Sequence, residues 1–281
     1  MKNEFLNLNG LLVKNEKAVI KKITSFQRQG RGKIHIVLDF DKTLVRGKDK
    51  KGRKITVWDA MEQFVPKEKQ LESIEKYEKY RVFELKQKLS ATHALEWWGW
   101  NLDLFKGLRA SRIKEASRLL QTRPFVKKFF NICQEKNIPT IIISASIRNV
   151  IESWCLREKI RPTKLLSTEL SVSGGKIIGW EKDTLIHSLN KKERGHKEIS
   201  AKGRPVSGWK KIKETRPKTI LIGDSLDDVS MVEGKDNVIR IAIYDPIHGN
   251  DNSELDEFMK NFDIVFVGDN FKPITKILNL F

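Results

Sequence analysis

Two aspartates one residue apart stand directly after an apolar run, in the pentapeptide Asp39-Phe40-Asp41-Lys42-Thr43. The run, residues 34–38 (IHIVL), is typical of a buried strand in a parallel sheet. Because alternate residues of an extended chain face the same way, we expect Asp39 and Asp41 to project together from the carboxyl end of this strand. Two carboxylates held this close repel each other unless a cation or a shared proton relieves them, so a divalent metal is the natural partner. The alternative is an acidic turn that caps a helix.

A second acidic cluster, residues 223–228 (GDSLDD), also follows an apolar run that is typical of a buried strand. Asp224 is placed to join Asp39 on a Mg²⁺ ion, which prefers a few carboxylates together with water and phosphate oxygens. Asp227 or Asp228 would reach the same ion, or would orient water and a lysine. On its own this segment would serve equally well as an Asx turn and an N-cap for the next helix. Beside the first acidic pair, a metal site is the stronger prediction.

A hydroxyl follows a third apolar run, residues 140–143, in the tripeptide Ser144-Ala145-Ser146. A hydroxyl at the end of a strand can donate a hydrogen bond to a phosphoryl oxygen. We select Ser144, with Ala145 beside it, because Ser144 directly follows the run. Ser146 is interpreted as a possible cap of a helix that begins at residue 147.

A cation completes the candidate site. A phosphoryl group under attack gathers negative charge, so a lysine beside it is useful. Lys191 and Lys192 lie about thirty residues before Asp224, after a strand-like segment. Residue chemistry alone does not separate them from the solvated lysines that most proteins carry.

The elements that must position these side chains alternate between strand and helix, which predicts an α/β fold with a parallel sheet covered on both faces. A hairpin is predicted at residues 171–180, turning at Gly174-Gly175. A basic N-terminal helix is expected over residues 1 to about 32, and a loop at 194–209. The predicted strands are 34–38, 140–143, 219–222, 238–243 and 264–267, and the predicted helices between them are 125–135, 147–158 and 253–260.

The stretch between the first two predicted strands breaks this alternation. It is helical by pattern, contains no strong strand, and is rich in Lys, Glu, Leu and Trp. We therefore predict a helical cap domain at 48–121, inserted into a catalytic core made of 1–47 and 122–281. The cap residues Trp97, Trp98 and Trp100 would either form its core or stack on a nucleobase.

Composition narrows the class of protein. Hydrophobic residues make up 39% of the 281, enough for a sizeable core, and no apolar stretch is long enough for a membrane helix. The two cysteines, Cys133 and Cys155, are too few for a disulfide framework, so we expect a cytoplasmic protein without a membrane partner. The formal net charge of +18 would attract phosphates or nucleic acids, or would reflect solvated surfaces alone.

The acidic, hydroxyl and lysine motifs, in this order, resemble those of the haloacid dehalogenase (HAD) superfamily of phosphotransferases. Its motifs DxDx[TV], a Ser or Thr after a strand, a Lys and a late acidic cluster match residues 39–43, Ser144, Lys191 and 223–228. The resemblance implies a HAD-like Rossmannoid parallel sheet with an inserted helical cap.

Within that superfamily the chain most resembles the pyrimidine 5′-nucleotidase family, from about residue 30 to the C-terminus. The likeness rests on the hairpin 175–180, the Ile186-His187 pair followed by Asn190-Lys191, and the segment 262–265 (FDIV). Two departures matter for the site. Asp227 stands where the family has glycine, and the acidic residues that the family places shortly before a Glu-Trp pair of the cap are missing, which puts the base preference in question.

The resemblance and the residue chemistry imply a Mg²⁺-dependent phosphomonoester hydrolase, most like a 5′-nucleotidase acting on nucleoside monophosphates. Asp39 would form an aspartyl-phosphate, and Asp41 would act as general acid and then base. The phosphate would be bound by Thr43, Ser144 and Ala145, with Lys191 offsetting its charge. The metal ligands would be Asp39, the backbone carbonyl of Asp41, Asp224 and Asp228.

Two alternatives stay open from the sequence. One is a HAD phosphatase for another small phosphomonoester, such as phosphoserine or a sugar phosphate. The other, which we favour less, is a nucleic-acid-binding protein on a HAD scaffold, because of the basic charge.

Overall fold

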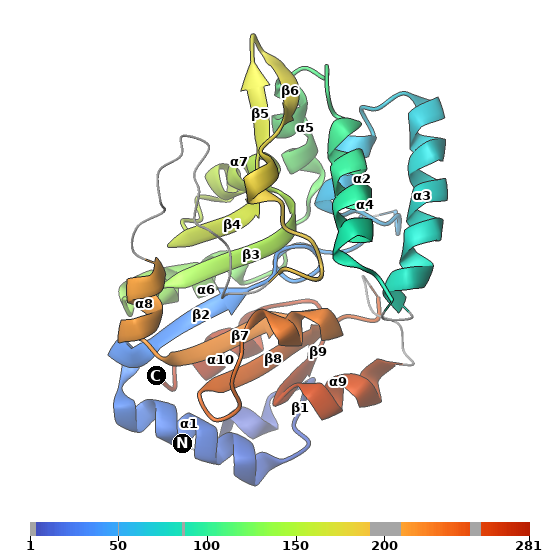
Figure 1. Cartoon of the computed structure of the whole chain (residues 1–281). Helices are drawn as coiled ribbons and strands as arrows, with labels where there is room; N and C mark the ends of the chain where they lie inside the picture. Colours follow the sequence, from blue (N-terminus) through green and yellow to red (C-terminus); the bar gives the residue numbers. More distant parts are fainter. Residues whose placement is uncertain (1–3, 50, 86–87, 192–208, 248–253) are drawn as a thin grey trace.

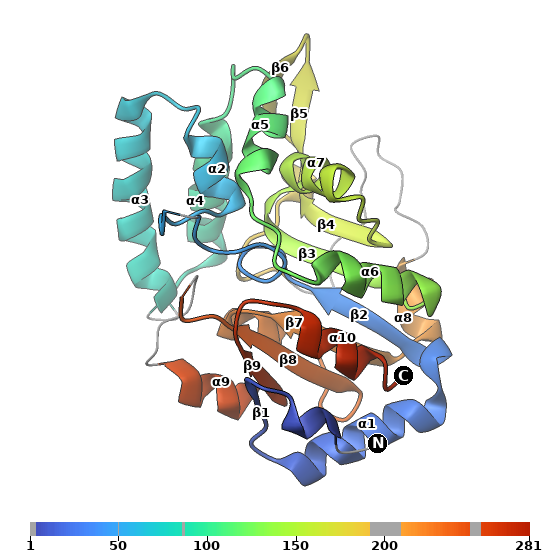
Figure 2. The same ribbon diagram turned by 180° about the vertical axis from the view of Figure 1, so that it is seen from behind.

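The fold is described from a computed structural model, which describes residues 4–49, 51–85, 88–191, 209–247 and 254–281 (Figures 1 and 2). The strands are β1 (Leu11–Leu12), β2 (Ile34–Leu38), β3 (Thr140–Ile147), β4 (Lys164–Thr168), β5 (Leu170–Ser173), β6 (Lys176–Trp180), β7 (Lys218–Gly223), β8 (Val238–Tyr244) and β9 (Ile264–Val267). The α-helices are α1 (Glu16–Gln29), α2 (Val57–Glu62), α3 (Lys67–Leu85), α4 (Ala91–Asp103), α5 (Ser111–Leu119), α6 (Val126–Glu135), α7 (Arg148–Glu158), α8 (Trp209–Thr215), α9 (Leu255–Asn261) and α10 (Lys272–Leu278).

The core is a seven-stranded sheet in the order β1-β9-β8-β7-β2-β3-β4, parallel except for the edge strand β1. This confirms the predicted α/β class. β2 lies between β3 and β7, with Ile36 paired to Thr140 on one side and to Ile220 on the other. Because the three strands are parallel, their carboxyl ends meet at one edge of the sheet, which is where an open α/β sheet binds ligands.

Alternate side chains of β2 pack into apolar clusters on opposite faces of the sheet. This is expected of a central strand that is covered on both faces. Ile36 and Leu38 belong to the large apolar cluster that includes Phe129 of α6 and Ile274 of α10. Val37 packs on the opposite face, with Met231. Figure 2 shows α6 and α10 in front of the sheet, and Figure 1 shows α8 and α9 on the other side. The first acidic pair, Asp39 and Asp41, therefore follows a strand that is packed on both faces.

Four helices, α2 to α5, lie between β2 and β3 in the chain, inside the interval predicted for the cap. α3 and α4 stand side by side beyond the carboxyl edge of the sheet in both views (Figures 1 and 2). Their own small core contains Tyr80, Leu89, Ala94 and Trp97. The hairpin β5–β6, which turns at the predicted glycines, contacts α4.

Some sequence predictions needed correction. The expected N-terminal helix covers only Glu16–Gln29, and the two-residue edge strand β1 precedes it. β4 was not predicted, because KLLST is short and half-buried at the other edge. β3 continues to Ile147, so α7 begins at Arg148. Most of the loop predicted at 194–209 lies outside the described residues. None of the described helices is long and apolar enough to cross a membrane.

The end of α7 gives a prediction about stability. Lys159 is exposed and has φ +56°, the left-handed conformation that favours glycine after a helix. We expect Lys159→Gly to raise the free energy of unfolding by about 0.5–1 kcal/mol. Urea denaturation would measure it. Lys21→Gly is the matched control, because it removes the same charge from an exposed site inside α1 and should lower stability by about 1 kcal/mol. A loss of stability in both variants would contradict the argument.

Candidate active site

Three buried carboxylates meet at the carboxyl edge of the sheet. Asp39 follows β2, Asp224 follows β7, and Asp228 lies in the 3-10 turn Leu226–Met231 that comes next. One oxygen from each lies within 4.8 Å of the others, and their exposed fractions are 6%, 5% and 1%. Oxygen ligands of this charge and spacing suit a hard divalent cation. Of the residues predicted as metal ligands, these three are brought together.

The backbone of the acidic loop fixes Asp228. One of its oxygens, Oδ2, accepts hydrogen bonds from the backbone N–H groups of Asp224 and Ser225, each at 3.0 Å. Gly223 makes this approach possible, because a Cβ on that residue would lie 2.4 Å from Oδ2 and 2.6 Å from the Asp228 Cβ. The extra carboxylate of Asp227 is exposed and lies outside the cluster. The acidic loop therefore depends on the glycine at position 223. Its place at the end of a predicted strand did not indicate this role in the sequence.

Lys191 bridges two of the carboxylates. Its Nζ donates to Asp39 Oδ1 at 2.6 Å and to Asp228 Oδ1 at 2.7 Å, and its side chain is only 11% exposed. Burial alone would lower the pKa of Lys191, but the carboxylates of Asp228 and Asp39 raise it above its usual value, so the lysine stays charged.

The loop that carries Lys191 is held by its neighbour. Asn190 accepts a hydrogen bond from the His187 N–H at 2.7 Å and donates one to the Leu185 carbonyl at 2.9 Å. These bonds explain why asparagine precedes the lysine in the motif.

Asp41 is not one of the three clustered carboxylates. Its Oδ1 accepts from the Val57 N–H at the start of α2, at 2.8 Å, and its Oδ2 accepts from the Ser146 hydroxyl. Burial raises the pKa of Asp41 to about 6, although the Ser146 hydrogen bond lowers it. A carboxyl group with this pKa can both give and accept a proton near neutral pH.

The structure separates the two serines of the third motif. Ser146 does not cap α7, as we had interpreted it, because β3 extends through it and its hydroxyl reaches Asp41 instead. Ser144, the predicted phosphate ligand, is buried on the same strand with 1% exposure. The Ala145 carbonyl accepts from the indole N–H groups of Trp58 and Trp98, each at 3.2 Å.

Thr43 is directed at the acidic cluster. Its hydroxyl donates to Asp224 Oδ1 at 2.7 Å. Burial, with the Asp228 carboxylate beside it, raises the pKa of Asp224 to about 6 even though Lys42 and Thr43 act in the other direction. Burial also raises the pKa of Asp39, against the opposing pull of Lys191. The cluster thus concentrates more negative charge than Lys191 alone neutralises.

Arg123 holds the loop of the first motif from behind, and the sequence analysis missed it. Lys42 has φ +58°, which turns its carbonyl toward the Arg123 guanidinium, and Arg123 donates to this oxygen at 2.7 and 3.0 Å. The arginine is itself buried and paired with Asp245 and Asp269. Nothing near Arg123 in the sequence marks this role, because its partners lie far along the chain.

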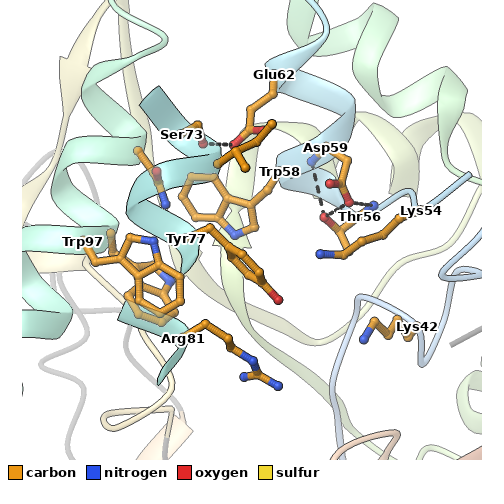
Figure 3. A pocket seen from close by; sticks show the side chains of 13 residues that line it. Lys42, Lys54, Thr56, Trp58, Asp59, Glu62, Ser73, Tyr77, Arg81 and Trp97 are labelled. Atoms are coloured by element: carbon orange, nitrogen blue, oxygen red, sulfur yellow. Dashed lines mark hydrogen bonds between the residues drawn. The ribbon is translucent and has the colours of Figure 1, made fainter. Parts of the chain in front are cut away.

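A pocket of about 360 Å³ opens between the core and the helices α2, α3 and α4 (Figure 3). Its aromatic walls are Trp58, Tyr77, Trp97 and Trp98. Among the described residues, the buried Trp97 indole N–H has no hydrogen-bond partner, and neither does the Asn101 side-chain oxygen, which also lines the pocket. Aromatic faces with one donor and one acceptor are suited to a planar polar ligand.

The pocket is lined by two of the three cap tryptophans and by several charged residues. Trp97 and Trp98, predicted either to stack or to pack, line the pocket, whereas the Trp100 ring lies under the Lys76 ammonium instead. The charged lining residues are Lys42, Lys54, Asp59, Glu62 and Arg81.

Comparison with known proteins gives a consistent picture. The family model described as pyrimidine 5′-nucleotidase (UMPH-1) matches residues 42–280. A 7-methylguanosine phosphate-specific 5′-nucleotidase A of Xenopus laevis is 28% identical over 267 residues, covering 88% of this chain and 87% of the relative. The human 7-methylguanosine phosphate-specific 5′-nucleotidase is 25% identical, covering 89% and 85%.

Among solved structures, cytosolic 5′-nucleotidase IIIB bound to cytidine is similar with a TM-score of 0.78 and 23% identity, covering 98% of this chain and 94% of that one. A substrate-bound phosphoserine phosphatase is similar with a TM-score of 0.55 and 17% identity, covering 87% and 97%. At these identities the two structures support the fold alone.

The first prediction for the site concerns Gly223. We expect Gly223→Ala to displace Asp228 and to weaken Mg²⁺ binding by about tenfold or more, as the loss of a group that orients metal ligands does. Titration calorimetry would measure the affinity. Gly32→Ala is the matched control, since a Cβ there meets nothing within 4 Å. Unchanged affinity in Gly223→Ala would show that the position of Asp228 does not matter for metal binding.

The second prediction concerns the metal-free protein. The pKa of Asp224 is raised from 3.8 to about 6, so ionisation of this group costs stability as pH rises through that range. We expect Asp224→Asn without metal to be more stable than wild type by about 1–3 kcal/mol at pH 7.5, and equal to it below pH 4. Added Mg²⁺ should stabilise wild type alone. Chemical denaturation at both pH values, with and without Mg²⁺, would test this, and a variant less stable at pH 7.5 would contradict it.

Proposed function

Because the chain belongs to the pyrimidine 5′-nucleotidase (UMPH-1) family, we propose that it hydrolyses nucleoside 5′-monophosphates with Mg²⁺ through an aspartyl-phosphate. The observation that carries the proposal is the buried cluster of Asp39, Asp224 and Asp228 bridged by Lys191, with Asp41 beside it. A structural ion-pair network would not need a pocket with aromatic walls next to it.

In the first step the Asp39 carboxylate attacks phosphorus, and the bond to the nucleoside 5′ oxygen breaks. Asp41 gives its proton to that oxygen, so the nucleoside leaves neutral. The pKa of about 6 supports this role, because a fraction of Asp41 carries a proton at neutral pH. Lys191 offsets the charge that gathers on the transferring group.

In the second step Asp41, now ionised, takes a proton from water, and the resulting hydroxide attacks phosphorus of the aspartyl-phosphate. The Asp39 carboxylate is released and inorganic phosphate leaves. The Ser146 hydroxyl and the Val57 N–H keep the Asp41 carboxylate oriented through both steps. We assign contacts to the phosphate oxygens to Thr43, Ser144 and the backbone at Ala145.

The donor set fits Mg²⁺, since several buried oxygens carry more negative charge than Lys191 balances. Asp39, Asp224 and the Asp41 carbonyl would hold the ion, and Asp228 would orient its water ligands. When bound, Mg²⁺ supplies the positive charge that lets an anionic carboxylate approach an anionic phosphate.

We assign the base to the pocket lined by Trp97 and Asn101. A volume of about 360 Å³ suits a nucleoside better than the small side chain of phosphoserine. The named relatives act on 7-methylguanosine phosphate, and the similar solved structure holds cytidine, so both purine and pyrimidine nucleotides are candidates.

Residues 48–121 would form the cap that closes over the site and excludes water. We place the protein in the cytoplasm, in line with the name of the similar solved structure, cytosolic 5′-nucleotidase IIIB.

A panel of phosphate esters tests the proposal. Wild type with Mg²⁺ should release phosphate from one or more of CMP, UMP, GMP, AMP and 7-methyl-GMP faster than from phosphoserine or a sugar phosphate. Asp39→Asn keeps the shape of the residue but removes the nucleophile, so turnover should fall by at least about 10³-fold. Asp227→Asn is the control, because it removes an exposed carboxylate of the acidic loop and should keep the wild-type rate. Undiminished turnover in Asp39→Asn would reject the mechanism, and a preference for phosphoserine would reject the substrate class.

A further inference from the structure

One hydrogen-bond donor in the pocket wall has no acceptor among the described residues. Three tryptophans line the pocket, Trp58, Trp97 and Trp98. The indole N–H groups of Trp58 and Trp98 both donate to the Ala145 carbonyl, each at 3.2 Å. The indole N–H of Trp97 has no partner in the part of the chain that the structure describes, although only 5% of this residue is exposed. A buried donor without an acceptor costs stability, so its presence in a pocket wall points to a ligand that completes the hydrogen bond.

An unpartnered acceptor lies one helical turn away. Asn101 follows Trp97 by four residues in α4, and residues at this spacing are neighbours on one face of a helix. The buried side-chain oxygen of Asn101 accepts no hydrogen bond from the described residues, and Asn101 lines the same pocket. A donor and an acceptor are therefore placed side by side in the wall of the pocket.

The contacts around α4 fix the Trp97 indole in this position. Its ring stacks on the Tyr80 ring, with the two centroids 5.7 Å apart. Elsewhere on α4, Gly99 faces the Trp180 ring so closely that a Cβ on Gly99 would lie 3.2 Å from it. The Trp180 indole N–H also donates to Asp103 Oδ1 at the end of α4, at 2.9 Å. The helix and the ring are thus held before a ligand arrives, which lowers the entropic cost of binding.

The donor and the acceptor lie where the base of a nucleotide would be. Figure 3 shows Trp97 on the opposite side of the pocket from Lys42. Lys42 belongs with the acidic cluster, because it lowers the pKa of Asp224. A nucleotide with its 5′ phosphate at this cluster therefore extends its base toward Trp97. One indole cannot stack on a base and also donate to it in the plane of the ring, so stacking falls to the other aromatic walls.

We propose that Trp97 and Asn101 read the polar edge of the base. The Trp97 N–H donates to a ring nitrogen or a carbonyl oxygen of the base, and the Asn101 oxygen accepts from the amino or ring N–H group beside it. This inference rests on the proposed function and specifies its substrate, a phosphate ester whose leaving group carries a planar base with an acceptor next to a donor. An apolar ring of the same shape would fill the pocket but would leave both protein groups unpaired.

The test separates hydrogen bonding from stacking. For the best nucleotide of the panel, kcat/KM is compared with that of an isostere whose base keeps the shape of the ring but has no polar edge. Difluorobenzene replaces a pyrimidine, and indole linked through its nitrogen replaces a purine. We expect wild type to prefer the natural nucleotide by about a hundredfold or more, because the isostere leaves a buried donor and a buried acceptor unpaired.

Asn101→Leu is similar in size and removes the acceptor. The ratio of the two kcat/KM values should therefore fall by about tenfold or more. A merely structural effect would lower both values together and leave their ratio unchanged. The matched control is Asn131→Leu, which removes an amide from an exposed site of α6 outside the pocket and should keep the wild-type ratio.

A second readout uses the protein without nucleotide. Replacing an unpartnered acceptor by an apolar side chain removes the cost of leaving it unpaired. We therefore expect the urea midpoint of Asn101→Leu to equal that of wild type or to exceed it. An asparagine with a structural partner would lose stability instead, so a clear fall in the midpoint would overturn the inference.

The inference and the proposed function fail in different ways. Turnover of natural nucleotides without a preference over the isostere would overturn the reading of the base edge and leave the nucleotidase activity in place. A preference that survives unchanged in Asn101→Leu would do the same. No turnover of any nucleotide would instead overturn the proposed function.

Discussion

The mutual repulsion of three buried carboxylates is the constraint on which the rest of the structure depends. Asp39, Asp224 and Asp228 are almost fully removed from water, and burial raises the pKa of both Asp39 and Asp224. One ammonium, that of Lys191, bridges two of them. A buried cluster with this charge is stable only because the surrounding chain fixes every member, and it gains stability when a cation binds. The same excess of charge that costs stability would therefore favour the binding of a metal ion.

The devices that fix the cluster are mostly backbone contacts made by residues that do no chemistry. Arg123 holds the Lys42 carbonyl in a left-handed loop, Asn190 closes the loop before Lys191, and Gly223 leaves room for Asp228. Each of them restricts where a neighbouring charged group can lie. Since the strength of a charged contact in a dry site depends steeply on distance, such residues matter for function as much as the acids they support.

The sequence predicted what short-range physics determines. The apolar runs at β2 and β9 were placed at their observed bounds, and the DxD spacing after β2 predicted carboxylates at the sheet edge. Contacts between residues that lie far apart in the chain could not be predicted from the sequence. Ser146 was misread as a helix cap because its partner, Asp41, lies 105 residues away, and Arg123 gave no signal because its partners lie at 42, 245 and 269. Lys191 was selected by family resemblance, since a buried lysine and a solvated one look alike in sequence.

Chemistry and selectivity occupy different parts of this chain, yet they are physically joined. The proposed reacting groups stand at strand ends of the sheet, whereas the pocket walls come from α2, α3 and α4. Trp58 and Trp98 donate to the same Ala145 carbonyl, one residue from Ser146, which in turn holds Asp41. The walls of the pocket are thus tied to the end of β3, where Ser146 orients Asp41, the proposed proton donor. Substitutions deeper in the pocket can change which nucleotide fits without removing these two hydrogen bonds to Ala145. Selectivity can therefore vary on this scaffold while the proposed acid and nucleophile keep their positions.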